Sequence, residues 1–136
     1  MKINEIKMDI ATVPQGYTLV GAFSTDKNFS IGTPGLFNRT FEITNRTDGD
    51  FKVGTAKRID NLYMLFVKES SYDMPDWTAL ENALCDLRKK VTKKRIRKLA
   101  MPKICTGGGG FDWQQVENLI CDIFDDVDVE ILVCDY

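Results

Sequence analysis

Four consecutive glycines at positions 107–110 are the feature of this sequence that bears most directly on chemistry. The segment 98–104, which we expect to be a strand, leads into them, and Asp112 follows in a position suited to capping a helix. Glycine lets successive backbone N–H groups turn toward one point, and a helix N-terminus favours negative charge. The pattern predicts a cradle for a phosphate group, although runs of glycine also occur in plain surface turns.

A lysine and a polar loop follow two other apolar runs. Lys68 comes directly after the run 62–67, and the loop that starts at Ser24 comes directly after the run 17–23. In open α/β sheets, ligands bind beyond the carboxyl ends of the strands. We therefore expect the loop after Phe23, Lys68 and the glycine run to converge on one site. Phosphates would lie on the glycines, and Lys68 would face whatever the phosphates carry.

The complete absence of histidine restricts the chemistry that this site could perform. The 136 residues contain no His, so Ser-His-Asp and Cys-His nucleophile systems and histidine metal sites are excluded. Proton transfer must use Asp, Glu, Lys, Tyr, Cys or water. Nothing in the sequence calls for a cofactor or a metal ion.

The four cysteines, Cys85, Cys105, Cys121 and Cys134, are not spaced as a C-x-x-C pair. A zinc site is therefore not expected, and the cysteines are typical of reduced, mostly buried thiols in a cytosolic protein. Cys105 differs because it lies beside the glycine run, where a reactive thiol is conceivable. No signal-peptide pattern and no apolar run of about 20 residues is present, so we expect a cytoplasmic protein that does not span a membrane.

Charge is unevenly distributed along a chain whose net charge is −2. Residues 88–98 hold eight basic side chains in eleven positions, and residues 122–135 are rich in Asp and Glu. A basic run can bind nucleic acid or another polyanion. It can equally be the solvated end of a helix, and no aromatic residues interleave it as a base-stacking surface would require.

Alternating apolar runs and helical patterns indicate the elements that position these residues. We expect strands at 3–8, 17–23, 51–59, 62–68, 98–104 and 129–134, the third and fourth joined at Asp60 and Asn61. We expect a short helix at 36–41 with Pro34 near its start, a polar turn at 45–50, and helices that begin after Asp76 and Asp112, the latter in a capping box with Gln115. This order predicts one α/β domain over residues 1–136, with a mixed, mostly parallel sheet and helices on both faces.

Several of these segments resemble the macrodomain family. They are the segment 7–10 (Lys-Met-Asp-Ile, a variant of K-G-D-I/L), the loop 24–41, and the segment 101–107 together with Trp113. The likeness extends over nearly the whole chain. It is strongest to the branch that removes terminal ADP-ribose from glutamate, and to the related ADP-ribose-1″-phosphate phosphatases. It implies a three-layer α/β/α fold and a ligand that is ADP-ribose, an ADP-ribosylated protein or a related small molecule.

The resemblance also implies roles for individual residues. Asp9 would accept a hydrogen bond from the adenine amino group, with the backbone of Ile10 beside it. The loop 24–33, with Ser24, Gly32 and Thr33, would wrap the distal ribose and a phosphate. Backbone N–H groups would hold the diphosphate along the segment made of Cys105, Thr106, Gly107, Gly108, Gly109, Gly110 and Phe111.

Lys68 stands at the position of the catalytic lysine of the glutamate-directed branch, whose amine attacks C1″ of the distal ribose and forms a covalent lysyl intermediate. The chain departs from that branch at Gly109, where the branch carries an aspartate, while Asp112, three residues later, is expected to cap the helix. It also retains only Gly32 of the M-G-x-G pattern. An adenine-stacking aromatic is replaced by Cys134, with Tyr136 two residues beyond.

Three functions therefore remain open from the sequence. The first is an enzyme, either an ADP-ribosyl hydrolase or an ADP-ribose-1″-phosphate phosphatase, which Lys68 and the glycine loop favour. The second is a binding module for ADP-ribose or a related nucleotide, which the loss of the aspartate at Gly109 favours. The third is a nucleic-acid-binding domain that uses the basic run.

Overall fold

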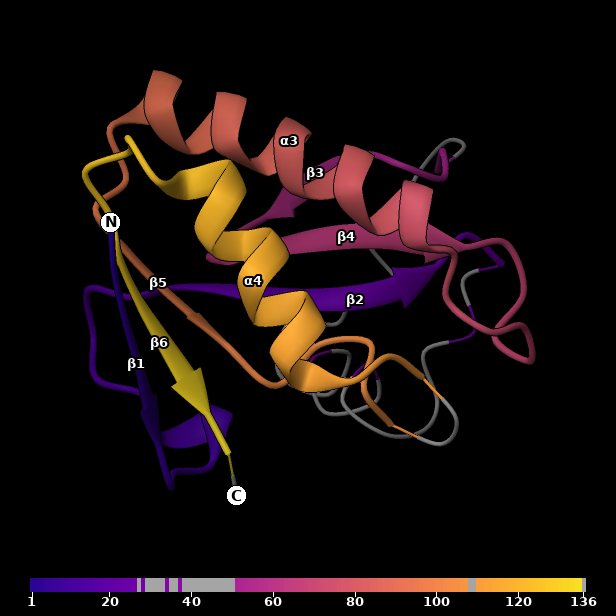
Figure 1. Cartoon of the computed structure of the whole chain (residues 1–136), viewed down its shortest axis with the longest axis horizontal. Coiled ribbons are helices and arrows are strands. Elements are labelled where there is room, and N and C mark those ends of the chain that lie inside the picture. Colours follow the sequence, from indigo (N-terminus) through magenta and orange to yellow (C-terminus); the bar gives the residue numbers. More distant parts are fainter. Residues whose placement is uncertain (27, 29–33, 35–36, 38–50, 108–109, 136) are drawn as a thin grey trace.

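The computed structural model describes residues 1–26, 28, 34, 37, 51–107 and 110–135, and these form a six-stranded mixed sheet with the order β1-β6-β5-β2-β4-β3 (Figure 1). The strands are β1 (Lys2–Ile6), β2 (Thr18–Ser24), β3 (Ala56–Ile59), β4 (Leu62–Lys68), β5 (Lys98–Met101) and β6 (Glu130–Cys134). Neighbouring strands are parallel except β3 and β4, which form an antiparallel hairpin. The predicted α/β class and mostly parallel sheet are confirmed.

The centre of the sheet is the run of apolar residues in β4. All of its residues up to Val67 are buried, and successive side chains face opposite sides. Tyr63, Leu65 and Val67 pack under the helices, whereas Leu62, Met64 and Phe66 belong to the cluster on the other face. Burial on both faces explains why the run is continuously apolar rather than alternating.

Two long helices cover one face of the sheet, in front of it in Figure 1: α3 (Trp77–Lys94) and α4 (Trp113–Phe124). Each helix packs its apolar stripe against the sheet, and Leu80, Leu84 and Leu87 of α3 are fully buried there. Asp76 caps α3 as predicted, because its carboxylate accepts a hydrogen bond from the Ala79 N–H at 2.9 Å. None of the described helices is both long and apolar enough to span a membrane.

The opposite face carries the short helix η1 (Ile10–Thr12) and the helical residue Phe37. Phe37 is 2% exposed and its ring lies 5.9 Å from that of Phe23. A Cβ on Gly21 would lie 2.5 Å from the Phe37 ring, so the ring fits against β2 only because residue 21 has no side chain. Helical residues thus cover both faces. Most of the predicted helix 36–41, and the predicted turn 45–50, lie outside the described residues.

Several predicted boundaries are wrong for identifiable reasons. The third strand begins at Ala56 rather than at residue 51, because Phe51 leaves the strand to stack on the Phe66 ring at 4.4 Å. β5 ends at Met101 because Pro102 has no N–H for the sheet ladder. Asp112 occupies the N-cap position of α4, but its side chain makes no capping hydrogen bond, so the predicted capping box does not form.

Candidate functional site

The carboxyl ends of β2, β4 and β5 enclose a cavity of about 740 Å³. From β4 the chain crosses beyond β2 to form β5, so three parallel strands bring their carboxyl ends to this edge of the sheet. Its volume lies within the roughly 300–1,000 Å³ typical of small-molecule sites. Ser24, Lys68, Cys105 and Gly107 contribute to its wall, as does the segment 71–75, which lies to the right of the sheet in Figure 1.

Lys68 is half-buried at the end of β4, where the pairing with β2 shifts register between Phe23 and Ser24. Its Nζ donates to the backbone carbonyl of Ser71 at 3.3 Å and to that of Asp73 at 3.2 Å. The turn that follows β4 therefore holds the amine in the wall of the cavity. Because these two hydrogen bonds hold the side chain, Lys68 can present its nitrogen to a ligand without first reorienting.

Asp26 ties the loop after β2 to the turn after β4. Its carboxylate accepts hydrogen bonds from Ser24 Oγ at 2.6 Å and from the N–H groups of Asn28 at 3.0 Å and Ser71 at 2.7 Å. Desolvation acts to raise the pKa of Asp26, but these hydrogen bonds together outweigh it and lower the pKa to about 2. Asp26 is therefore ionised in the working protein and fixes two walls of the cavity relative to each other.

Replacing Asp26 by Asn should destabilise the protein in a pH-dependent manner. The depressed pKa means that the stabilisation is fully present above the ordinary value of 3.8 and is lost as the pH falls through about 2. Allowing for solvent around this exposed carboxylate, the difference at pH 7 should be about 1 kcal/mol. Urea unfolding of both proteins between pH 2 and pH 7 measures it. A difference that stays constant over this range would contradict the assigned role.

The segment after β5 folds into a compact loop through its own backbone. The Phe111 N–H donates to the Cys105 carbonyl at 2.7 Å, and the Gly110 N–H donates to the Gly107 carbonyl at 2.9 Å. These two N–H groups are therefore already committed, contrary to their predicted role in holding a diphosphate. Among the described residues, the N–H groups of Thr106 and Gly107 have no such partner. The available part of the predicted cradle is thus its beginning.

The loop is anchored to α3 and to the sheet. The Phe111 ring meets the Trp77 ring edge-on at 5.0 Å, and Thr106 Oγ1 donates to the Lys103 carbonyl at 2.7 Å. Lys103 in turn forms ion pairs with Glu5 at 2.8 Å and Asp135 at 3.3 Å, which raise its pKa, the hydrogen bond to Glu5 most of all. The Pro-Lys-Ile segment therefore joins the ends of β1, β5 and β6.

Cys105 is not a reactive thiol. Burial raises the pKa of Cys105 to about 12, although the positive charge of Lys68 acts in the opposite direction. The thiol is therefore protonated and weakly nucleophilic. The expectation that the cysteines are mostly buried is also wrong, because Cys134 alone is buried, Cys105 and Cys121 are intermediate, and Cys85 is exposed.

Asp9 and Ile10 lie at the same edge of the sheet but do not line the cavity. Asp9 caps η1, where one carboxylate oxygen accepts from the Ala11 N–H at 3.0 Å. Ile10 is 7% exposed and packs into the core. Asp9 is close enough to Cys134, at the end of β6, for its charge to raise the pKa of that thiol, after the larger effect of burial. A ligand reaching both Asp9 and Lys68 must therefore cross the ends of β6, β5 and β2.

The structure thus brings together Ser24, Lys68, Cys105 and Gly107, with Thr106, Gly110 and Phe111 in the same loop as the last two. Gly32, Thr33, Gly108 and Gly109 lie outside the described residues. Sequence reasoning missed Asp26, Ser71 and Asp73. Ser71 and Asp73 lie in a polar segment that ends in proline directly after the buried strand β4, whereas Asp26 follows β2 with no comparable signal.

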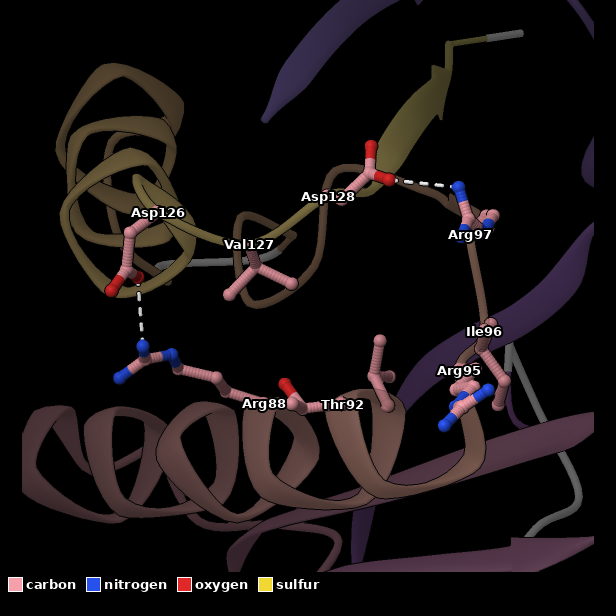
Figure 2. Close-up of a pocket in the computed structure, with 9 residues that line it drawn as sticks. Arg88, Thr92, Arg95, Ile96, Arg97, Asp126, Val127 and Asp128 are labelled. Carbon is pink, nitrogen blue, oxygen red and sulfur yellow. Dashed lines mark hydrogen bonds and ion pairs between the residues drawn. The ribbon is translucent and has the colours of Figure 1, made fainter.

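A smaller cavity of about 220 Å³ lies at the far end of α3 (Figure 2). Arg88 and Arg97 line it, and Figure 2 shows them paired with Asp126 at 2.7 Å and Asp128 at 2.8 Å. Two basic residues of the run 88–98 are thus neutralised here, and Lys90 pairs with Asp86 at 3.0 Å. Two of the three arginines in its wall are paired and its described lining holds no lysine or cysteine, so this cavity is a weaker candidate for a catalytic site than the one at Lys68.

Residues 32–120 match the Macro domain family, and the chain belongs to this family. It is 27% identical over 137 residues to the ADP-ribose glycohydrolase OARD1 of Bos taurus, with 97% of this chain and 90% of that protein covered. Among solved structures it is similar to the macrodomain of Thermus aquaticus DarG, with a TM-score of 0.84, 20% identity and 98% of each chain covered. It is also similar to Thermosipho africanus DarTG in complex with ADP-ribose, with a TM-score of 0.77, 14% identity, and 99% of this chain but 42% of that chain covered.

Proposed function

We propose that residues 1–136 form a single macrodomain that binds ADP-ribose, or a molecule carrying it, along the edge from Asp9 to Lys68 and hydrolyses the bond at C1″ of the distal ribose. The observation that carries this proposal is the amine of Lys68 in the wall of a cavity of about 740 Å³, at the strand ends of a Macro domain fold. The name of the bovine relative, an ADP-ribose glycohydrolase, supports the reaction type.

In the proposed reaction the distal ribose lies in the cavity with its C1″ facing Lys68 Nζ. The unprotonated amine attacks C1″, the bond from C1″ to the acceptor oxygen breaks, and the electron pair leaves with the acceptor carboxylate. The two carbonyls that hold Nζ fix the direction of attack. The N–H groups of Thr106 and Gly107, which have no backbone partner among the described residues, donate to a phosphate, and Gly107 lines the same cavity.

A binding module that does not turn its ligand over is the second candidate. It is favoured by Gly109, since the glycine loop lacks a carboxylate to accept a proton. Calorimetric titration with ADP-ribose, followed by a hydrolysis assay on ADP-ribosyl-glutamate peptide and on ADP-ribose-1″-phosphate, separates the possibilities. Binding with release of ADP-ribose from the peptide supports the hydrolase. Binding with phosphate release alone supports the phosphatase, binding alone supports the module, and no binding refutes all three.

Replacing Asp9 by Ala should weaken ADP-ribose binding by about tenfold, because a charged acceptor for the adenine amino group is lost. An analogue with hypoxanthine in place of adenine lacks that amino group. It should bind the native protein about tenfold more weakly than ADP-ribose does, and lose little more in Asp9→Ala. Calorimetry of the four combinations gives the coupling directly. Additive losses, or unchanged affinity in the variant, would remove Asp9 from the adenine site.

A further inference from the structure

The proposed hydrolysis needs a group that accepts a proton, and the two loops around the distal ribose contain a single acidic residue, Asp26, which is too weak a base to act. The rest of the loop 24–33 and residues 106–111 contain neither Asp nor Glu. Histidine is absent from the chain, and burial keeps the thiol of Cys105 protonated by raising its pKa to about 12. A carboxylate from another part of the cavity wall must therefore act, or the reaction must proceed without one.

Asp73 is the only carboxylate among the described residues that line the cavity. It lies in the turn that holds Lys68, because its own carbonyl accepts from Lys68 Nζ at 3.2 Å. The turn is closed by two further hydrogen bonds: the Asp73 N–H donates to the Ser70 carbonyl at 3.0 Å, and Asp73 Oδ2 accepts from the Ser70 N–H at 3.2 Å. One carboxylate oxygen thus fixes the side chain, and Oδ1 has no recorded partner among the described residues.

Two other carboxylates near the site are unsuited to this task. Asp26 accepts three hydrogen bonds of 3.0 Å or less, and its pKa of about 2 makes it a weak base. The side chain of Asp112 makes no capping hydrogen bond, but Asp112 does not line the cavity. Among the described residues, Asp73 alone combines a place in the wall, a hydrogen bond that orients its side chain, and a carboxylate oxygen without a hydrogen-bond partner.

We propose that Asp73 is the general base that activates water to hydrolyse the lysyl intermediate, in place of the aspartate absent at Gly109. This inference rests on the proposed function. After the attack, Lys68 nitrogen is bonded to C1″ as a protonated secondary amine. Water attacks C1″ and gives a proton to Asp73, while the bond from C1″ to nitrogen breaks and its electron pair returns to Lys68 as a neutral amine. Asp73 then releases the proton to solvent, and ADP-ribose leaves with a hydroxyl at C1″.

The test compares Asp73→Asn with Glu69→Gln on ADP-ribosyl-glutamate peptide. The Asn amide oxygen can still accept from the Ser70 N–H, so the turn is kept while the base is removed. Turnover should fall by about 10²–10³-fold, with ADP-ribose affinity within about threefold of the native value. Mass spectrometry of the variant should show a covalent adduct on Lys68 during turnover, since the first step remains possible. Glu69→Gln removes the same charge from the residue beside Lys68, outside the cavity wall, and should turn over as the native protein does.

Chemical rescue separates a base from a purely structural residue. In Asp73→Ala, added sodium formate should restore at least a tenth of the native rate, because a small carboxylate can enter the space left by the side chain. Native-like turnover in Asp73→Asn, or loss of activity in Asp73→Ala without rescue and without an adduct, overturns the role of Asp73 and leaves the proposed hydrolase standing. Native protein that binds ADP-ribose but releases none from the peptide overturns both.

Discussion

Lys68→Gln should abolish hydrolysis, lowering turnover by at least about 10³-fold, while ADP-ribose still binds within about threefold of the native affinity. A covalent nucleophile contributes only to the transition state and the intermediate, so its loss lowers kcat and not ligand affinity. Glutamine retains an N–H donor for the carbonyls of Ser71 and Asp73, to which Lys68 Nζ donates at 3.3 Å and 3.2 Å. The turn that shapes the cavity should therefore survive the substitution.

The measurement pairs steady-state hydrolysis of ADP-ribosyl-glutamate peptide with calorimetry of ADP-ribose and a thermal melt. Lys94→Gln, at the exposed last turn of α3, removes the same charge far from the cavity and should behave as the native protein does. If Lys68→Gln keeps more than a tenth of the native rate, the lysine is not a nucleophile. If the affinity for ADP-ribose falls as steeply as the turnover, Lys68 is a binding residue, and this result supports the binding module over the hydrolase.

The elements that position the site could be predicted because each carries a local signal. The run 62–68 is apolar at every position but the last, and it became β4 without a shift of boundary. Asp76 precedes an apolar stripe of period three to four, and it caps α3. The convergence of Ser24, Lys68 and the loop after β5 followed from one general property of parallel sheets, that their carboxyl ends share an edge.

The contacts that complete the site could not be predicted, because they join residues far apart in the chain. Asp26 accepts the Ser71 N–H across 45 positions, and neither residue belongs to a recognisable motif. The sequence pattern places Phe51 in a strand, yet it lies outside β3 and its ring stacks on that of Phe66. Asp112 illustrates the converse error, since a residue type suited to an N-cap need not make the capping hydrogen bond.

The glycine run shows how a correct motif can be given an imprecise role. Four glycines predict a loop that exposes backbone N–H groups, yet the N–H of Gly110 and that of Phe111 are consumed in closing the loop on itself. Cys105, at φ 61°, turns the chain sharply at its start. The glycines therefore serve two purposes: the first leaves an N–H available to a ligand, and the last allows the chain to fold back on Cys105.

Gly110→Ala should consequently disrupt both the loop and the site. An added Cβ would collide with the carbonyl oxygen of Cys105, and would lie 2.9 Å from its carbonyl carbon and 3.0 Å from the Gly107 carbonyl oxygen. All of these are backbone atoms that cannot rotate away, so the loop must open and lose the hydrogen bonds from Gly110 and Phe111 at 2.9 Å and 2.7 Å. At about 1 kcal/mol each, these losses predict a melting temperature lower by several degrees.

Ligand binding should weaken when the loop opens, since the same closure positions Gly107, which lines the cavity, and Thr106 beside it. We expect ADP-ribose affinity to decrease by about 10- to 100-fold in Gly110→Ala, measured by calorimetry beside a thermal melt. Gly107→Ala is the matched control for stability, because a Cβ there meets nothing within 4 Å, and its melting temperature should stay near the native value. Gly110→Ala that melts and binds as the native protein does would show that the loop is not the phosphate-binding part of the site, and the diphosphate would then have to be held elsewhere along the edge.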